Sequence, residues 1–176
     1  MIEREIKIRV ADHQALRPLL KAMGATSLGS EEEINRILDT AESTLYKRRE
    51  LLRVRSTSRG VLTWKGPAAA QDSTGHKMRE ELEVPIPGER VDTLLALLAH
   101  LGYHEVLRYD KVRETWRWQG VEIVLDSLEF GDFVEIEGEA GAIEQAIHLL
   151  HLDGQPLERR SYAELQRLAQ QERGGR

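Results

Sequence analysis

Apolar and polar residues alternate strictly over most of this chain, which is the pattern of strands with one apolar and one polar face. Turn signals such as Gln119-Gly120 and Gly131-Asp132 separate several of the alternating segments. The predicted strands are 2–10, 30–39, 50–57, 60–66, 77–85, 106–118, 120–128 and 132–138. This spacing favours an antiparallel sheet rich in hairpins.

Helical spacing of apolar residues interrupts the strand pattern. The helical candidates are residues 13–23, 90–101, 141–151 and 162–171. Pro18 should bend the first helix or mark a late start, and the small, polar segment 67–76 is expected to form a mobile loop. The chain shows no internal repeat and no linker, so we predict a single α+β domain over residues 1–176.

Sorting the predicted strands by parity separates an apolar face from a charged one, because successive side chains point to opposite sides of a strand. The apolar face, expected to pack on the helices, carries Ile6, Ile8, Val10, Leu52, Val54, Leu62, Trp64, Leu82, Val84, Val112, Trp116, Trp118, Ile123, Leu125, Val134 and Ile136. The opposite face carries Glu3, Glu5, Lys7, Arg9, Arg53, Arg55, Lys65, Arg79, Glu81, Glu83, Lys111, Arg113, Arg117, Glu122, Asp126, Glu135 and Glu137.

On any single strand, such charges are explained by a face exposed to solvent. Two features of the whole set of strands instead favour a site that binds ions. The positions are almost all fully charged, and the charges are segregated by sign. Acidic pairs stand at 3/5, 81/83 and 135/137, and basic pairs at 53/55 and 111/113. Residues i and i+2 of a strand lie only about 6.5 Å apart, so each like-sign pair repels itself unless a counter-charge is near. Acidic pairs therefore favour a bound cation, and basic pairs a bound anion.

Carboxylates without cysteine or strand-borne histidine suit a hard divalent ion such as Mg²⁺ or Mn²⁺. Arginine pairs suit phosphate, because a guanidinium binds two phosphate oxygens at once. A polyphosphate bridged by metal accounts for both signs of charge. Our interpretation from the residues is therefore a metal–polyphosphate site on one face of the sheet, in preference to a solvated face.

Composition narrows the partners and the compartment. The formal net charge of −5 argues against nucleic acid or an anionic membrane surface as a general partner. Cysteine is absent, which excludes disulfides and thiolate chemistry and fits a reducing compartment. We see neither a signal peptide nor a membrane span in the sequence, so we expect a cytoplasmic protein.

A series of motifs in one order resembles the CYTH family, which contains class IV adenylyl cyclases, thiamine triphosphatases and other triphosphate tunnel metalloenzymes. The series begins with E-x-E-x-K at Glu3, Glu5 and Lys7. It continues with "LLRVR" (51–55), "LTWKGP" (62–67), "KMREELEV" (77–84), "LGYHEVLRYDKVRETW" (101–116), "VEIVLDSL" (121–128), "GDFVEIEGE" (131–139) and "RRSYAEL" (159–165). E-x-E-x-K alone is a weak signal, whereas the ordered series is strong.

The resemblance implies an eight-stranded antiparallel β-barrel, a tunnel with its polar face inside and helices packed outside. It implies a metal site at Glu3, Glu5, Asp126, Glu135 and Glu137, holding Mg²⁺ or Mn²⁺. It implies a triphosphate cradle of Lys7, Arg53, Arg55, Lys65, Lys111 and Arg113. Lys7, Arg79 and Glu81 are the expected catalytic residues, with Arg79 and Glu81 near the substrate or the attacking water.

The same apparatus serves two reactions, and the sequence favours hydrolysis of the terminal phosphate over the class IV cyclase reaction, which makes cyclic AMP and pyrophosphate from ATP. Aromatic residues are few, at 5% of the chain, and Ile37 and Leu38 stand where the family has aromatic residues. A polyphosphate-binding protein without turnover is the alternative of another class. Lys47–Arg49 is interpreted as a solvated turn, with a role at the tunnel mouth as the less favoured alternative. The identity of the triphosphate and the choice between monomer and homodimer stay open.

Overall fold

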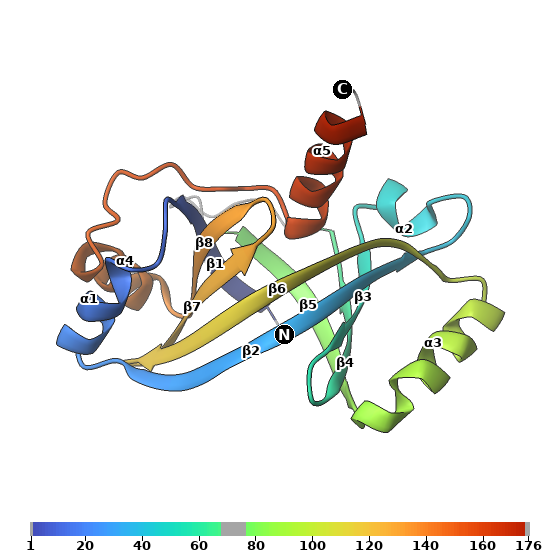
Figure 1. The fold of residues 1–176 in the computed structure, drawn as a ribbon, viewed down its shortest axis with the longest axis horizontal. Helices are drawn as coiled ribbons and strands as arrows, with labels where there is room; N and C mark the ends of the chain where they lie inside the picture. The colour runs from blue at the N-terminus through green and yellow to red at the C-terminus, as the bar shows by residue number, and fades with distance from the viewer. Residues whose placement is uncertain (1, 68–76, 175–176) are drawn as a thin grey trace.

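A computed structural model describes residues 2–67 and 77–174, leaving aside the side chains of residues 2, 3, 77 and 78 (Figure 1). The expected loop 67–76 therefore lies almost wholly outside the described residues. The described strands are β1 (Ile2–Val10), β2 (Thr26–Asp39), β3 (Leu51–Ser56), β4 (Gly60–Lys65), β5 (Lys77–Ile86), β6 (His104–Trp118), β7 (Val121–Leu128) and β8 (Gly131–Glu137). They form a closed antiparallel barrel in the order β1-β5-β4-β3-β2-β6-β7-β8, which confirms the predicted fold.

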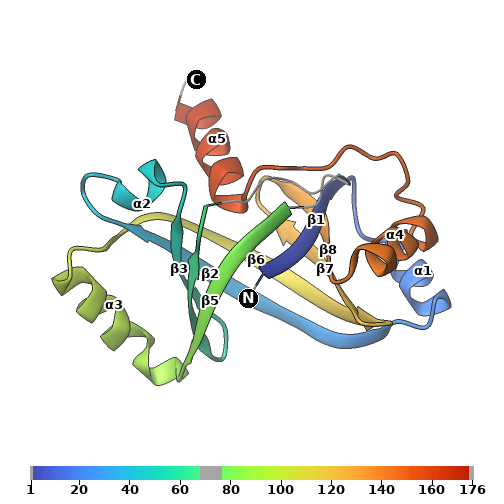
Figure 2. The same cartoon turned by 180° about the vertical axis from the view of Figure 1, so that it is seen from behind.

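Strand β1 closes the barrel by pairing with a different partner at each end. Its first residues, from Ile2 to Glu5, pair with β5, and its residues from Glu5 to Val10 pair with β8. Strand β2 begins at Thr26, before the predicted residue 30, because β6 is long enough to pair with it back to Thr26. The two strands form a long ribbon across the molecule, visible from both sides in Figures 1 and 2.

The helices stand outside the barrel (Figure 2). They are α1 (Leu16–Ala22), α2 (Thr44–Lys47), α3 (Val91–His100) after a short 3₁₀ turn (Gly88–Arg90), α4 (Ala140–Leu149) and α5 (Tyr162–Gly174). Pro18 lies in the first turn of α1, where a helix needs no N–H from it. The four-residue helix α2 is too short for a periodic pattern to predict. The Asp39 carboxylate holds its start by accepting the N–H groups of Leu45 at 2.9 Å and Tyr46 at 3.0 Å.

The outer face of the barrel is apolar, as predicted, and most of it is covered. Ile6, Ile8, Ile123 and Ile136 lie in one core with residues of α1 and α4, and all four are nearly inaccessible. A separate core joins β2 and β3 to α3. Cover is missing on β5, where the expectation was wrong: Leu82 is 55% and Val84 53% exposed, because α3 packs against the β3 side of the barrel. The expectation was also wrong for Val112 of β6, which is 44% exposed.

The inner face of the barrel carries the charged residues. Side chains of Lys7, Glu33, Lys111 and Asp126 are buried there, so ionisable groups occupy the interior of a closed sheet. Burying charge is costly unless each group is paired. The ion pairs that meet this cost define the candidate site. Among the described residues, no helix is both long and apolar enough to cross a membrane.

Candidate active site

The barrel lumen encloses a cavity of about 280 Å³. The side chains that line it come from β1, β3–β8 and the first turn of α5. They are Glu5, Lys7, Leu51, Arg53, Arg55, Lys65, Arg79, Glu81, Glu83, Tyr109, Lys111, Arg113, Glu122, Glu135, Glu137, Ser161, Tyr162 and Ala163. The parity of the strands thus brings most of the predicted site residues into one cavity. The side chain of Glu3 is not described, and Asp126 lies behind the lining, fully buried.

Lys7 and Glu135 form an ion pair inside this lumen. The Lys7 Nζ lies 3.2 Å from the Glu135 carboxylate, and the two residues are directly opposite in the β1–β8 register. Burial alone would lower the pKa of Lys7, but the charges of Glu135 and Glu5 outweigh it and raise that pKa. Burial would raise the pKa of Glu135, yet Lys7 and Arg113 hold it well below its usual range. Both groups are therefore charged at neutral pH.

Asp126 is fully buried and accepts hydrogen bonds from two cationic side chains and one hydroxyl. Lys111 Nζ donates to Oδ2 at 3.0 Å, and the Arg113 guanidinium binds both carboxylate oxygens at 2.7 and 2.6 Å. The Tyr162 hydroxyl donates to Oδ2 at 2.9 Å. Asp126 thereby positions Lys111 and Arg113 in the lumen. Its predicted role as a metal ligand stays a prediction.

Tyr162 is a lumen residue to which the sequence assigned no role. Its ring lies 3.9 Å from Lys7 Nζ, measured to the ring centroid, and 5.2 Å from Lys111 Nζ. Both ammonium groups are within the range of a cation–π interaction. Lys7 Nζ also donates to the Arg160 carbonyl at 3.2 Å, just before α5. Residues at the start of α5 and just before it therefore help to hold the two lysines in the lumen.

Glu33 is a second inner-face residue that the sequence did not reveal, and it lies behind the side chains that line the cavity. Its side chain is 1% exposed and lies 3.3 Å from Lys111 Nζ and 3.4 Å from the Arg55 guanidinium. Burial would raise the pKa of Glu33, but Lys111, Arg113 and Arg55 outweigh burial and lower it. The sequence did not predict this position, because Glu31, Glu32 and Glu33 are consecutive and resemble a solvated segment. Without alternation of apolar and polar residues, nothing shows which of the three faces the interior.

Lys111 is a lumen lysine whose pKa is lowered from its ordinary value of 10.5. Burial lowers its pKa, and the neighbouring charge of Arg113 lowers it further. Asp126 and Glu33 oppose this effect, and the pKa settles at about 8. Lys111 is therefore mostly protonated at neutral pH and can lose its charge in mildly alkaline solution.

The wall formed by β3, β4 and β5 holds the remaining predicted cradle residues. Lys65 is ion-paired to Glu81, and the Arg53 guanidinium lies 3.7 Å from the Glu83 carboxylate. Arg79 is turned to the backbone, donating to the carbonyl of Gly66 and, at 2.9 Å, to that of Arg49. Arg79 and Glu81 both face the cavity, and their expected contact with substrate or water stays a prediction.

Three lumen carboxylates lie side by side on adjacent strands. Glu5 on β1 is opposite Glu137 on β8, which is opposite Glu122 on β7. Like charges in directly opposite positions destabilise a sheet, so a cation at this row would relieve repulsion. Every atom in the row that could bind a metal is a carboxylate oxygen, and such oxygen ligands suit Mg²⁺ or Mn²⁺. Among the described side chains, no three carboxylate or histidine groups lie close enough together to hold a metal ion.

The expected lumen face ends at Arg9 and Arg117, which do not line the cavity. Arg9 is exposed, donates to the Phe130 carbonyl at 2.8 Å and covers the Phe133 ring. The Arg117 side chain is 64% exposed, 3.8 Å from Glu122. Both lie near strand ends, where the parity of a strand no longer decides whether a side chain enters the tunnel.

Comparisons with known proteins agree with this architecture. A model of the CYTH domain matches residues 1–162. "Putative adenylate cyclase MJ0240" of Methanocaldococcus jannaschii is 27% identical, with 96% of this chain and all of that protein aligned. The PH1819 protein of Pyrococcus horikoshii OT3 has a similar structure, with a TM-score of 0.76, 30% identity and coverage of 96% of this chain and 99% of that one.

A protein from Hippeastrum shares the fold. HpAC1, described as a putative adenylyl cyclase with a dominant triphosphatase activity, matches with a TM-score of 0.76 and 23% identity over 95% of this chain and 96% of that chain. The family model covers most of the chain, in agreement with the charged lumen and the closed barrel. The chain belongs to the CYTH domain family.

Proposed function

We propose that this protein is a divalent-metal-dependent enzyme that binds a triphosphate in the barrel lumen and hydrolyses a phosphoanhydride bond. The observation that carries the proposal is the segregation of charge within one cavity. A row of carboxylates, Glu5, Glu137 and Glu122, lines one side of the lumen, and the other strands carry arginines and lysines together with the carboxylates that pair with them. An anion site alone has no need of that acidic row.

The basic residues would bind the phosphate oxygens. Arg53 and Arg55 on β3, Lys65 on β4 and Arg113 on β6 converge on the cavity together with Lys7. Carboxylates already fix their positions, so little reorganisation is required when charge develops on the leaving group. Guanidinium groups bind phosphate oxygens in pairs, which suits the terminal and bridging groups of a triphosphate.

The acidic residues would hold the metal. The predicted ligands are Glu3, Glu5, Asp126, Glu135 and Glu137, and the register adds Glu122 to them. A divalent cation there would neutralise phosphate oxygens and lower the pKa of a bound water. Glu135 is shared with Lys7 and Arg113, so it links the metal side of the lumen to the phosphate side.

In the hydrolytic reaction, water attacks the terminal phosphorus and the bond to the bridging oxygen breaks. The proton of the water passes to solvent, and the leaving diphosphate carries the negative charge that the cradle stabilises. Arg79 and Glu81 are our candidates for contact with the substrate or the attacking water. Both line the cavity.

The class IV cyclase reaction is the second candidate, supported by the name of the archaeal relative. That reaction requires the ribose 3′-hydroxyl at the α-phosphorus and a fixed nucleoside. The aromatic residues lining the lumen are Tyr109 and Tyr162, both about 6% exposed, and Lys7 lies against the Tyr162 ring. Neither ring offers an open face for an adenine, and this favours hydrolysis.

A test of metal-dependent turnover uses tripolyphosphate with Mg²⁺ or Mn²⁺, before and after chelation. The proposal predicts orthophosphate release that chelation stops and that Glu137→Gln lowers at least about a hundredfold, because the variant loses a ligand charge. Glu139→Gln, an exposed carboxylate beyond the end of β8, is the matched control and should retain the wild-type rate. Tight metal-dependent binding without turnover would instead support the non-catalytic alternative.

A further inference from the structure

A second cavity, of about 520 Å³, opens beside the lumen between α2 and α5. We call it the mouth pocket; the residues that matter here are Tyr46, Lys47, Arg49, Arg79, Arg159 and Arg167. Arg79 and Leu51 line both cavities, so the mouth pocket continues the tunnel outward. A substrate that projects from the lumen past Arg79 would enter it.

The cations of the mouth pocket differ from those of the lumen. Lumen bases such as Lys7, Lys65 and Arg113 are ion-paired to carboxylates. Among the residues that the structure describes, Lys47 and Arg49 have no ion-pair partner, and both are exposed. An exposed cation without a carboxylate partner binds an anion without first breaking an ion pair.

Three carboxylates also line the pocket; Asp39 and Glu164 accept backbone N–H groups, and Glu50 is half-buried. Asp39 accepts the N–H groups at the start of α2, at 2.9 and 3.0 Å. Glu164 accepts the N–H of Ser161 at 2.7 Å at the start of α5. The apolar lining residues Leu38 and Leu45 are only 2% and 7% exposed. The lining carries five cationic side chains against these three carboxylates, so the net charge of the pocket is positive.

We propose that the mouth pocket is an anion subsite for the phosphates that follow the third one in a longer linear polyphosphate. The inference rests on the proposed function, because it places the first three phosphates in the lumen. The guanidinium of Arg167 lies 4.7 Å from the centroid of the Tyr46 ring and covers one of its faces, which favours phosphate over a stacked base. The subsite needs no metal, and its exposed charges make it sensitive to salt.

The test is a calorimetric titration with Mg²⁺ present, comparing tripolyphosphate with a longer linear polyphosphate of defined length. The wild type should bind the longer chain at least about fivefold more tightly, an advantage that shrinks as salt is added. The double variant Lys47→Gln/Arg49→Gln should bind both chains equally, with unchanged affinity for tripolyphosphate. A thermal melt of the variant checks that the fold is intact.

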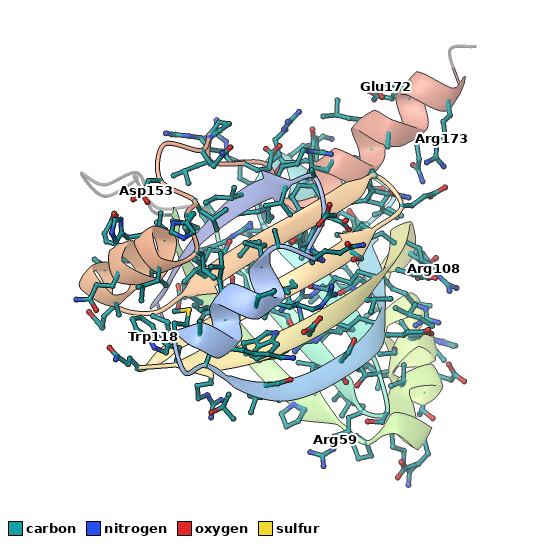
Figure 3. The ribbon with its side chains drawn as sticks, turned by 60° about the vertical axis from the view of Figure 1, so that its left-hand side comes forward. Arg59, Arg108, Trp118, Asp153, Glu172 and Arg173 are labelled. Atoms are coloured by element: carbon teal, nitrogen blue, oxygen red, sulfur yellow. The ribbon has the colours of Figure 1, made fainter. Side chains whose placement is uncertain are left out.

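The control is Arg59→Gln/Arg90→Gln, which removes the same charge from exposed positions. Arg59 lies at the end of the molecule remote from α5 (Figure 3) and should leave the chain-length preference unchanged. Equal binding of both chains by the wild type, or a preference that survives in Lys47→Gln/Arg49→Gln, would overturn the inference. So would tighter binding of an organic triphosphate that is lost on Tyr46→Ala. Failure of the enzyme to cleave any phosphoanhydride overturns the proposed function instead, since these titrations measure binding alone.

Discussion

Glu33 and Lys111 form an ion pair of 3.3 Å in the lumen wall, with each side chain only 1% exposed. The residues are directly opposite in the β2–β6 register, so the strand pairing alone brings them together. Neither charge reaches bulk water, and each therefore depends on its ionic partners for stabilisation. The stability of the barrel and the charge of the cradle are linked through this pair.

Glu33→Gln should lower the free energy of unfolding by about 3–5 kcal/mol, because it leaves Lys111, Arg55 and Arg113 with less negative charge in a buried site. Urea denaturation measures the change. Glu31→Gln, on the exposed part of the same strand, is the control and should stay within about 0.5 kcal/mol of the wild type. Equal stability of the two variants would contradict the assigned role of Glu33.

The lowered pKa of Glu33 predicts that the stability of the protein decreases in acid. The pKa of Glu33 is lower in the folded protein than its ordinary value of 4.5, so below about pH 4.5 the unfolded chain binds a proton that the folded chain does not. The stabilisation by Glu33 is therefore present above that pH and is lost as pH falls toward the folded pKa. Denaturation across this range should show a shallower acid decline for Glu33→Gln than for the wild type. Parallel declines would contradict the prediction.

Lys111 predicts an alkaline limit on catalysis. Its pKa of about 8 means that the cradle loses one positive charge as pH rises through that value. We expect kcat/KM for tripolyphosphate to fall above about pH 8, since this parameter reports the free enzyme. Nitrogen NMR of labelled lysine checks the cause directly, with Lys111 titrating near pH 8 and Lys7 above its ordinary value of 10.5. A Lys111 resonance that titrates above pH 10 would refute the explanation.

Glu5 and Asp126 are both predicted metal ligands, but only Asp126 is expected to be needed for stability. Glu5→Gln should abolish metal-dependent turnover with the fold intact, because it removes a charge that faces Glu137 across the strands. Asp126→Asn should lower the free energy of unfolding by about 3–5 kcal/mol even without metal, because Lys111 and Arg113 lose their buried counter-charge. Thermal melts with and without Mg²⁺, run beside activity assays, separate the two effects. Unchanged turnover in Glu5→Gln would show that the carboxylate assignment is wrong.

The barrel could be predicted because strict alternation records which side of each strand faces the interior. Lys7, Arg53 and Glu135 reach the lumen at the parity expected of them. The same rule did not reveal Glu33, which stands in a run of three glutamates, or the bare outer face at Leu82. Alternation shows that a face is apolar, but it does not show whether a helix covers that face.

Tertiary contacts explain the positions of Tyr162, Arg49 and Arg167, which the sequence could not predict. Tyr162 reaches Lys7 and Asp126 only because the segment before α5 pairs with β1, where the Glu158 N–H donates to the Lys7 carbonyl at 2.7 Å. Arg49 and Arg167 lie far apart in the chain and line one pocket because α2 and α5 stand at the same mouth of the barrel. Such contacts between distant segments leave no periodic signal in a sequence.

Phosphorus NMR of the products tests the central claim most directly. The protein is incubated separately with tripolyphosphate and with ATP, each with Mg²⁺ or Mn²⁺. Hydrolysis in the lumen predicts orthophosphate with diphosphate from the first substrate, and orthophosphate as the new inorganic product wherever ATP is accepted. Pyrophosphate with a cyclic nucleotide from ATP, or both substrates left unchanged, would contradict the account.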